Sequence, residues 1–176
     1  MHRIPRLVLP LLLVLLVGMI DFGKAINYWI DETHLSNAGA RWAVVNYNPG
    51  DPANTGIGSP TLQDYILSQA DTDELRGKSA GTQQIKHPAK VNICFYKASD
   101  QTLTTSPAVG DTVKVTVKYS YDWSRFLGAQ LPVIGQALAK TATTIGSSST
   151  MRLETIPTHY SSAANTGGAC PASTST

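Results

Sequence analysis

Residues 7–20 read LVLPLLLVLLVGMI, a run without a charge near the start of the 176-residue chain. As a helix this run spans about 21 Å, which is shorter than the hydrocarbon core of a bilayer at about 30 Å. Arg3 and Arg6 precede the run, as basic residues do in a secretory signal. One interpretation is therefore a cleaved signal, although Gly23-Lys24-Ala25 matches a small-x-small cleavage site poorly.

The alternative is a helix that stays in the membrane. Arg3 and Arg6 at one end and Lys24 at the other can extend their charged groups to the membrane surface, which lengthens the usable span. Tyr28 and Trp29 follow at positions where interfacial aromatic residues are common. Basic residues before the run predict an N-terminus in the cytoplasm and a C-terminal domain outside it.

A helical pattern continues beyond the apolar run and favours the retained helix. No proline or strong turn signal occurs before Asn48-Pro49-Gly50, so we predict one helix over about 7–46. The second half of this helix is amphipathic. The face that we expect to pack on a sheet consists of Phe22, Ile26, Trp29, Ile30, Thr33, Ala40 and Val44. The opposite, polar face consists of Lys24, Asn27, Asp31, His34 and Arg41.

The remainder of the chain predicts a small α+β head. Residues 48–59 are rich in proline, glycine and asparagine and predict a loop. Ser59-Pro60 predicts the start of a helix, and a further short turn stops near Gly77. Alternation of apolar and polar residues predicts three strands, at 91–96, 112–121 and 151–154. The expected fold class is α+β, with a long N-terminal helix packed on a small antiparallel sheet of three to four strands.

The chain divides into three predicted parts. Residues 1–24 form the membrane-anchoring segment, residues 25–160 an extracytoplasmic α+β domain, and residues 161–176 a loose tail rich in small residues. Within the domain, the segment Trp123–Leu138 is apolar but interrupted by glycine and proline. It predicts either a loop over the sheet edge or a surface that faces the membrane or a partner.

Cys94 and Cys170 are the only cysteines. Outside the cytoplasm two cysteines usually pair, and this pair would attach the tail to the first strand. The alternative is two free thiols.

Composition and motifs argue against catalysis and nucleic-acid binding. A formal net charge of +2 excludes a strongly basic nucleic-acid binder. The four histidines lack metal-ligand spacing, and Asp71-x-Asp73-Glu74 lacks the glycine and spacing of a calcium loop. No nucleophile motif or glycine-rich phosphate loop occurs, so we expect no catalytic residue, metal, cofactor or small-molecule substrate.

The N-terminal residues 7–13, 18–25 and 37–41 resemble the signature of the TadE-like family, and residues 113–117, 126–127 and 150–154 resemble the C-terminal half of that family. These proteins are pseudopilin-like components of bacterial tight-adherence (Flp, type IVb) pilus assembly. The resemblance implies a single-pass protein of the bacterial cytoplasmic membrane with an extracytoplasmic head. The implied partners are membrane lipid, pseudopilins and other pilus or secretion-system components. Ile4 stands where the family's processed form carries a glutamate.

The expected function is that of a minor pseudopilin, a structural protein that acts in cell adhesion by helix packing and protein contacts. Asp21, Phe22 and Gly23 would mark the membrane end of the helix. Residues small enough for close helix approach are Gly18, Gly23, Ala38, Gly39 and Ala40. Two rivals stay open: a secreted or anchored binding module with no pilus role, and a secreted hydrolase whose site is assembled from distant residues.

Overall fold

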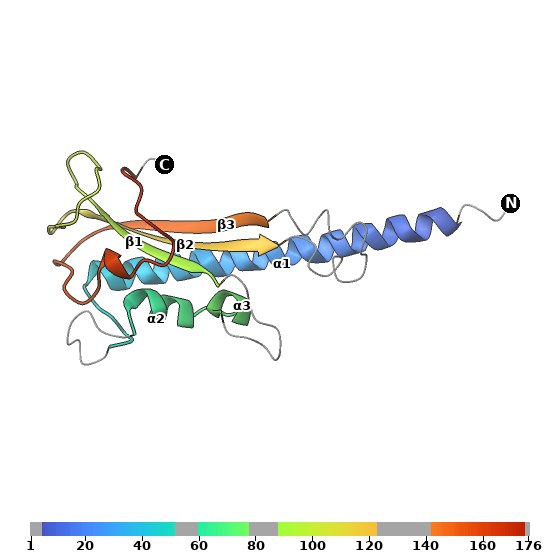
Figure 1. Ribbon diagram of the computed structural model, residues 1–176, viewed down its shortest axis with the longest axis horizontal. Coiled ribbons are helices and arrows are strands. Elements are labelled where there is room, and N and C mark those ends of the chain that lie inside the picture. The colour runs from blue at the N-terminus through green and yellow to red at the C-terminus, as the bar shows by residue number, and fades with distance from the viewer. Residues whose placement is uncertain (1–4, 52–59, 78–87, 123–141, 175–176) are drawn as a thin grey trace.

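The computed structural model describes residues 5–51, 60–77, 88–122 and 142–174 (Figure 1). Its helices are α1 (Pro5–Val44), α2 (Leu62–Ser68), α3 (Asp73–Arg76) and the short 3₁₀ helix η1 (Ser162–Ala164). Its strands are β1 (Lys90–Tyr96), β2 (Thr112–Asp122) and β3 (Ala142–Arg152). One long N-terminal helix packs on a three-stranded antiparallel sheet, which confirms the predicted α+β class.

The sheet has the order β1-β2-β3, and both pairs are antiparallel. Val115 of β2 lies opposite Ile93 of β1, and both side chains are buried, as the alternation along these strands predicts. The prediction for the third strand was wrong at its start: 151–154 was expected, but β3 begins at Ala142. Its first nine residues are mostly threonine, serine and glycine, so they carry no apolar alternation from which a strand could be predicted.

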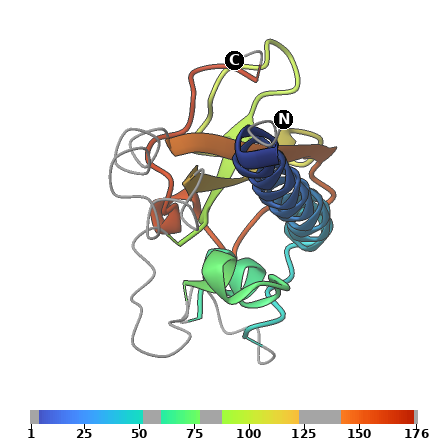
Figure 2. The same cartoon turned by 90° about the vertical axis from the view of Figure 1, so that its right-hand side faces the viewer.

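Helix α1 has two halves with different surroundings. Its forty residues span about 60 Å, whereas an eleven-residue strand spans about 36 Å. The C-terminal half lies along the sheet, and the N-terminal half projects beyond it (Figure 1). Helix α1 packs on β2 and β3, and α2 lies beside it and contacts both α1 and β1 (Figure 2). The sheet is therefore too short to cover the whole helix.

The packed face of α1 differs from the one that we predicted. Phe22, Ile26, Trp29 and Ile30 were expected to face the sheet, but all four are exposed. Asp31, expected on the polar face, is buried instead. The buried positions of the helix are Ala25, Tyr28, Asp31, Glu32, Leu35, Ser36, Gly39, Ala40, Ala43 and Val44. Small residues among them let the helix approach the sheet closely, and this packing requirement outweighs hydrophobicity alone.

Capping sets the bounds of the two short helices. Thr61, rather than the predicted Ser59, is the N-cap of α2, and its hydroxyl accepts the Asp64 backbone N–H while the Asp64 carboxylate accepts the Thr61 N–H. The predicted stop near Gly77 is confirmed: this glycine ends α3 at a φ of 70°, in the left-handed region. Buried Leu75 then attaches α3 to the head.

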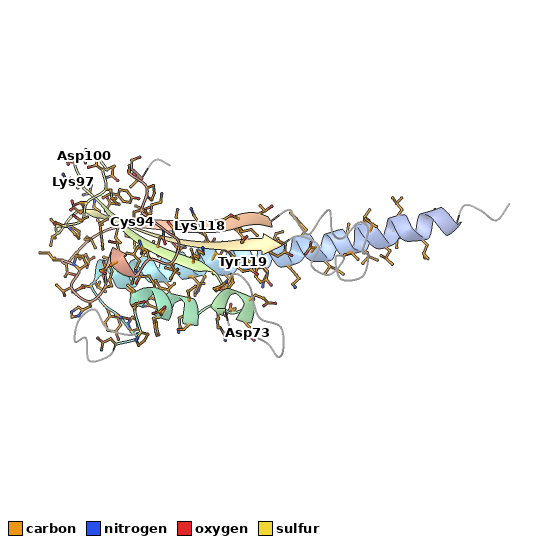
Figure 3. All side chains as sticks on the ribbon, viewed as in Figure 1. Asp73, Cys94, Lys97, Asp100, Lys118 and Tyr119 are labelled. Carbon is orange, nitrogen blue, oxygen red and sulfur yellow. A yellow bond between two sulfur atoms is a disulfide. The ribbon has the colours of Figure 1, made fainter. Side chains whose placement is uncertain are left out.

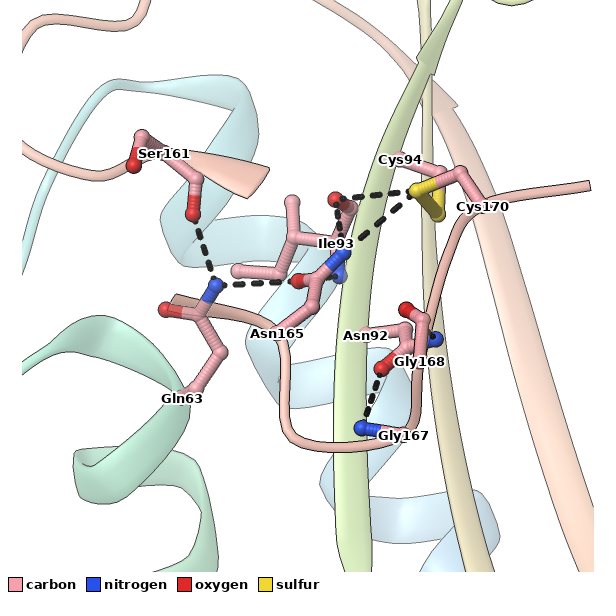
Figure 4. The surroundings of a disulfide bond; sticks show 9 residues. All are labelled: Gln63, Asn92, Ile93, Cys94, Ser161, Asn165, Gly167, Gly168 and Cys170. Atoms are coloured by element: carbon pink, nitrogen blue, oxygen red, sulfur yellow. Dashed lines mark hydrogen bonds between the residues drawn. A yellow bond between two sulfur atoms is a disulfide. The ribbon is translucent and has the colours of Figure 1, made fainter. Parts of the chain in front are cut away.

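The C-terminal tail is bound to β1, which corrects the expectation of a loose tail. The Asn165 side chain accepts the Ile93 N–H at 2.8 Å, and the Val91 N–H donates to the Thr166 hydroxyl at 2.9 Å. A disulfide joins Cys94 to Cys170 over a separation of 76 residues (Figure 4). A composition of small residues could not reveal these hydrogen bonds, because they depend on which strand edge lies nearby.

We predict that breaking the disulfide frees the tail and weakens the head. The variant Cys94→Ala/Cys170→Ala removes a long loop closure, so its free energy of unfolding should fall by about 4 kcal/mol in the chain-entropy model. Chemical denaturation measures this loss. Amide exchange should accelerate in residues 161–174 and not in β2. Reduced wild-type protein is the matched control, and equal stability of oxidised and reduced protein would contradict the prediction.

Candidate functional site

The N-terminal half of α1 is apolar, and no described part of the head covers it. Every large apolar side chain described from Val8 to Leu16 is at least half exposed, and Leu9 and Leu11 reach 71%. The helix is long and apolar enough to cross a membrane. Figure 3 shows the side chains of this half standing apart from the head, whereas those of the C-terminal half lie among the sheet and the short helices. Exposure of these apolar side chains to water would be unfavourable, which indicates that this surface contacts a membrane or a partner.

The apolar surface continues onto the head as a stripe on the outer side of α1. We call Phe22, Ile26, Trp29 and Ile30 the helix stripe. These residues recur at the helical spacing of three to four, and each is between 41% and 58% exposed. The next outward positions are polar: His34, Asn37 and Arg41. The apolar outer surface therefore ends at Ile30, well inside the part of the helix that carries the head.

The residues expected at the membrane end of the helix have three different surroundings. The Tyr121 hydroxyl donates to the Asp21 side chain and also contacts the Asp21 backbone oxygen at 3.1 Å. Phe22 belongs to the exposed stripe, and a side chain at Gly23 would meet nothing within 4 Å. Asp21 therefore attaches the end of the sheet to α1, and the other two residues stay available to a neighbour.

The small residues predicted for helix packing also separate into two sets. Gly18 and Gly23 face open space, so another helix could approach the backbone there. Gly39 and Ala40 are buried in the head. A Cβ at Gly39 would lie 2.6 Å from Ile66 Cδ1, so the close approach there is to α2 of the same chain. Ala38 is half-buried.

The residues predicted at the membrane surface are only partly arranged as expected. Lys24 and Trp29 are exposed, but Tyr28 is buried and its ring lies 5.4 Å from that of Tyr119. Tyr28 is thus a core residue of the head, and the prediction that it is interfacial was wrong. Figure 3 shows Tyr119 on the sheet beside α1. The side chains of Arg3 and Arg6, and the whole segment Trp123–Leu138, lie outside the described residues.

Glu32 is the most unusual polar group in the head. Its side chain is 0% exposed, and neither carboxylate oxygen has a hydrogen-bond partner among the described residues. Burial raises the pKa of Glu32 to about 8, with a smaller contribution from neighbouring Asp31. Glu32 is therefore mainly protonated at neutral pH.

Asp31 has a different environment. The Asp71 backbone N–H donates to its carboxylate at 2.9 Å, which links α1 to the turn before α3. Burial nevertheless raises the pKa of Asp31 above its usual value. Neither buried acid can be predicted from the sequence, because both lie in a stretch of the helix with an ordinary amphipathic pattern.

Other candidate chemistry is sparse in the part of the chain that the structure describes. No group of three or more His, Cys, Asp or Glu side chains there could hold a metal ion. A cleft of about 420 Å³ opens beside α1 and is lined by Lys24 and Glu74 among others. Among the described residues, the exposed apolar surface of α1 is therefore the strongest candidate for an interaction site.

Comparison of the chain with protein-family models, curated proteins and solved structures found no match.

We predict that Glu32 lowers the stability of the head at neutral pH. The unfolded chain releases the Glu32 proton above about pH 4.5, whereas the folded head keeps it up to about pH 8, so unfolding is favoured increasingly across this interval. Glu32→Met should raise the free energy of unfolding at pH 7 by about 3 kcal/mol and flatten its pH dependence between pH 5 and 8. Denaturation at several pH values measures both. Exposed Glu154→Met is the control, and an unchanged pH slope in Glu32→Met would contradict the prediction.

Proposed function

We propose that the protein is a membrane-anchored assembly component, a minor pseudopilin, of a bacterial tight-adherence pilus. The observation that carries the proposal is the division of α1: one continuous helix has a bare apolar half and a half packed into a folded head. A chain of this shape can hold a head beside a membrane without a flexible linker. The resemblance of residues 7–13, 18–25 and 37–41 to the TadE-like signature favours the pilus among the assemblies that use such an anchor.

The dimensions of the bare half support a membrane anchor. Residues 5–24 span about 30 Å as a helix, which is the thickness of the hydrocarbon core. Exposed Lys24 can extend to the membrane surface at one end of this span. The disulfide supports a head outside the cytoplasm, where such bonds persist.

Gly18 and Gly23 support a role in helix association. Both lie where the backbone is open, five residues apart on the bare half and at its boundary with the head. In a bilayer, helices associate through close packing at small residues rather than through the hydrophobic effect. The proposed activity is therefore assembly through helix contacts in the membrane and head contacts above it, without bond chemistry.

Deletion of the gene is the direct test of the pilus role. Cells that lack the protein should carry fewer or shorter surface pili and adhere less, and the gene supplied in trans should restore both. Pilus number and length are counted by electron microscopy. Unchanged pili and adhesion would contradict the proposed function.

A pair of glycine substitutions separates assembly from folding. Gly23→Leu should leave the thermal unfolding of the head unchanged but reduce piliation, because a Cβ there meets no described atom within 4 Å, the adjacent cleft has room for the rest of the side chain, and a partner helix could no longer approach the backbone. Gly39→Leu should instead destabilise the head by roughly 1–3 kcal/mol, because it overpacks the contact with Ile66. Calorimetry and pilus counts on both variants give the comparison. Normal piliation with Gly23→Leu would exclude helix packing at this position.

A further inference from the structure

The two edges of the sheet differ in whether another part of the chain covers them. The edge of β1 is covered by the tail, through the bonds of Val91 and Ile93 described above and the disulfide at Cys94. At the edge of β3, the backbone groups of residues 144–150 have no partner outside the sheet among the described residues. The described part of the sheet is thus closed on one side and open on the other.

The open edge lacks the features that normally prevent strand pairing. Exposed edges are commonly protected by charged side chains, proline or bulges. Residues 142–151 contain no charge and no proline, and β3 pairs with β2 without interruption from Ala142 to Arg152. Such an edge can accept an extended segment through main-chain hydrogen bonds.

The helix stripe lies beside this open edge. The Ser36 and Ser147 hydroxyls are 3.3 Å apart, which places the Ser36 side of α1 against β3. Trp29 precedes Ser36 by seven residues, almost two full turns, so it lies on the same side of the helix and about 10 Å closer to the membrane. A distance of about 10 Å corresponds to about three residues of a strand, so Trp29 lies level with Thr144, three residues before Ser147 in β3. Trp29 is nevertheless 53% exposed, because β3 is the last strand of the described sheet on this side.

We propose that the open edge of β3 and the helix stripe form one docking site for a β-strand of another protein. A strand beside β3 would lie about 4.8 Å further out, over Trp29 and Ile26. Its main chain would pair with residues 144–150. Its inward side chains would be apolar, to cover the stripe, and its outward side chains polar. The partner is thus an extended segment with alternating apolar and polar residues.

A second copy of this chain fits the site less well. Two identical edges meet around a two-fold axis as an antiparallel pair, with the two molecules pointing in opposite directions. Since α1 lies along the strands (Figure 1), the two N-terminal halves would then project in opposite directions and could not share one membrane. This choice of partner rests on the anchor of the proposed function.

Site-specific photo-crosslinking in the native cells tests the docking site. A photoreactive amino acid is introduced at Thr144, at the strand edge, or at Ile26, in the stripe; Lys90 on β1 is the control position. Both test positions should crosslink to a single stretch of one other protein, with alternating apolar and polar residues, and the control should not. Crosslinks to a second copy or to lipid alone, or no protein crosslink at either position, would overturn the proposal.

A substitution in the stripe adds a quantitative test. Trp29→Ser should reduce the crosslink from Thr144 about tenfold, because an aromatic anchor at the centre of the interface is lost. Ile156→Ser removes a similarly exposed apolar side chain elsewhere on the head and should leave the yield unchanged. An equal yield with Trp29→Ser would overturn the proposal.

Fractionation of the same cells separates the two proposals. A membrane-bound chain without these crosslinks would contradict the docking site alone. A chain found only in the medium would contradict the anchor.

Discussion

The structure depends on the mismatch in length between α1 and the sheet that packs on it. Strands of at most eleven residues cover the helix from Asp21 to Val44, and the described residues of the head leave the sixteen helical residues before Asp21 largely without cover. Because the helix is continuous, the bare half is held rigidly in line with the packed half (Figure 1). In the proposed anchor, a bilayer or other helices bury those apolar side chains.

The contact between α1 and β3 contains polar side chains at its centre, flanked by Ile145 and Met151. The Ser147 hydroxyl lies 3.3 Å from that of Ser36 on the helix, and Ser149, two residues further along the same face of the strand, is buried. Small polar residues permit a close approach but contribute less to stability than apolar residues of larger size. Most of the apolar burial that stabilises the head comes instead from β1 and β2, where valine and isoleucine side chains are fully buried. The β3 side of the head is thus the part best suited to accept a further element.

The sequence predicted the elements that have a clear local pattern, such as a periodic spacing of apolar residues or a glycine stop. The long helix, the two apolar strands and the stop at Gly77 all follow from local patterns, and the structure has each of them. The sequence did not predict which face of the helix packs, because that depends on the close contact at Gly39 rather than on the hydrophobicity of Phe22 or Trp29. The strand β3 and the bound tail were missed for a related reason. Their residues are small and polar, and only their neighbours give them a structure.

The central claim is that the bare half of α1 stays on the mature protein and lies in a membrane. Intact-mass measurement of the native protein, after separation of membranes from medium, tests it most directly. An anchored helix predicts a chain that keeps residues 7–20 and leaves the membrane fraction only with detergent. A soluble chain that begins near Ile26 would contradict the claim, and the apolar run would then be a secretory signal.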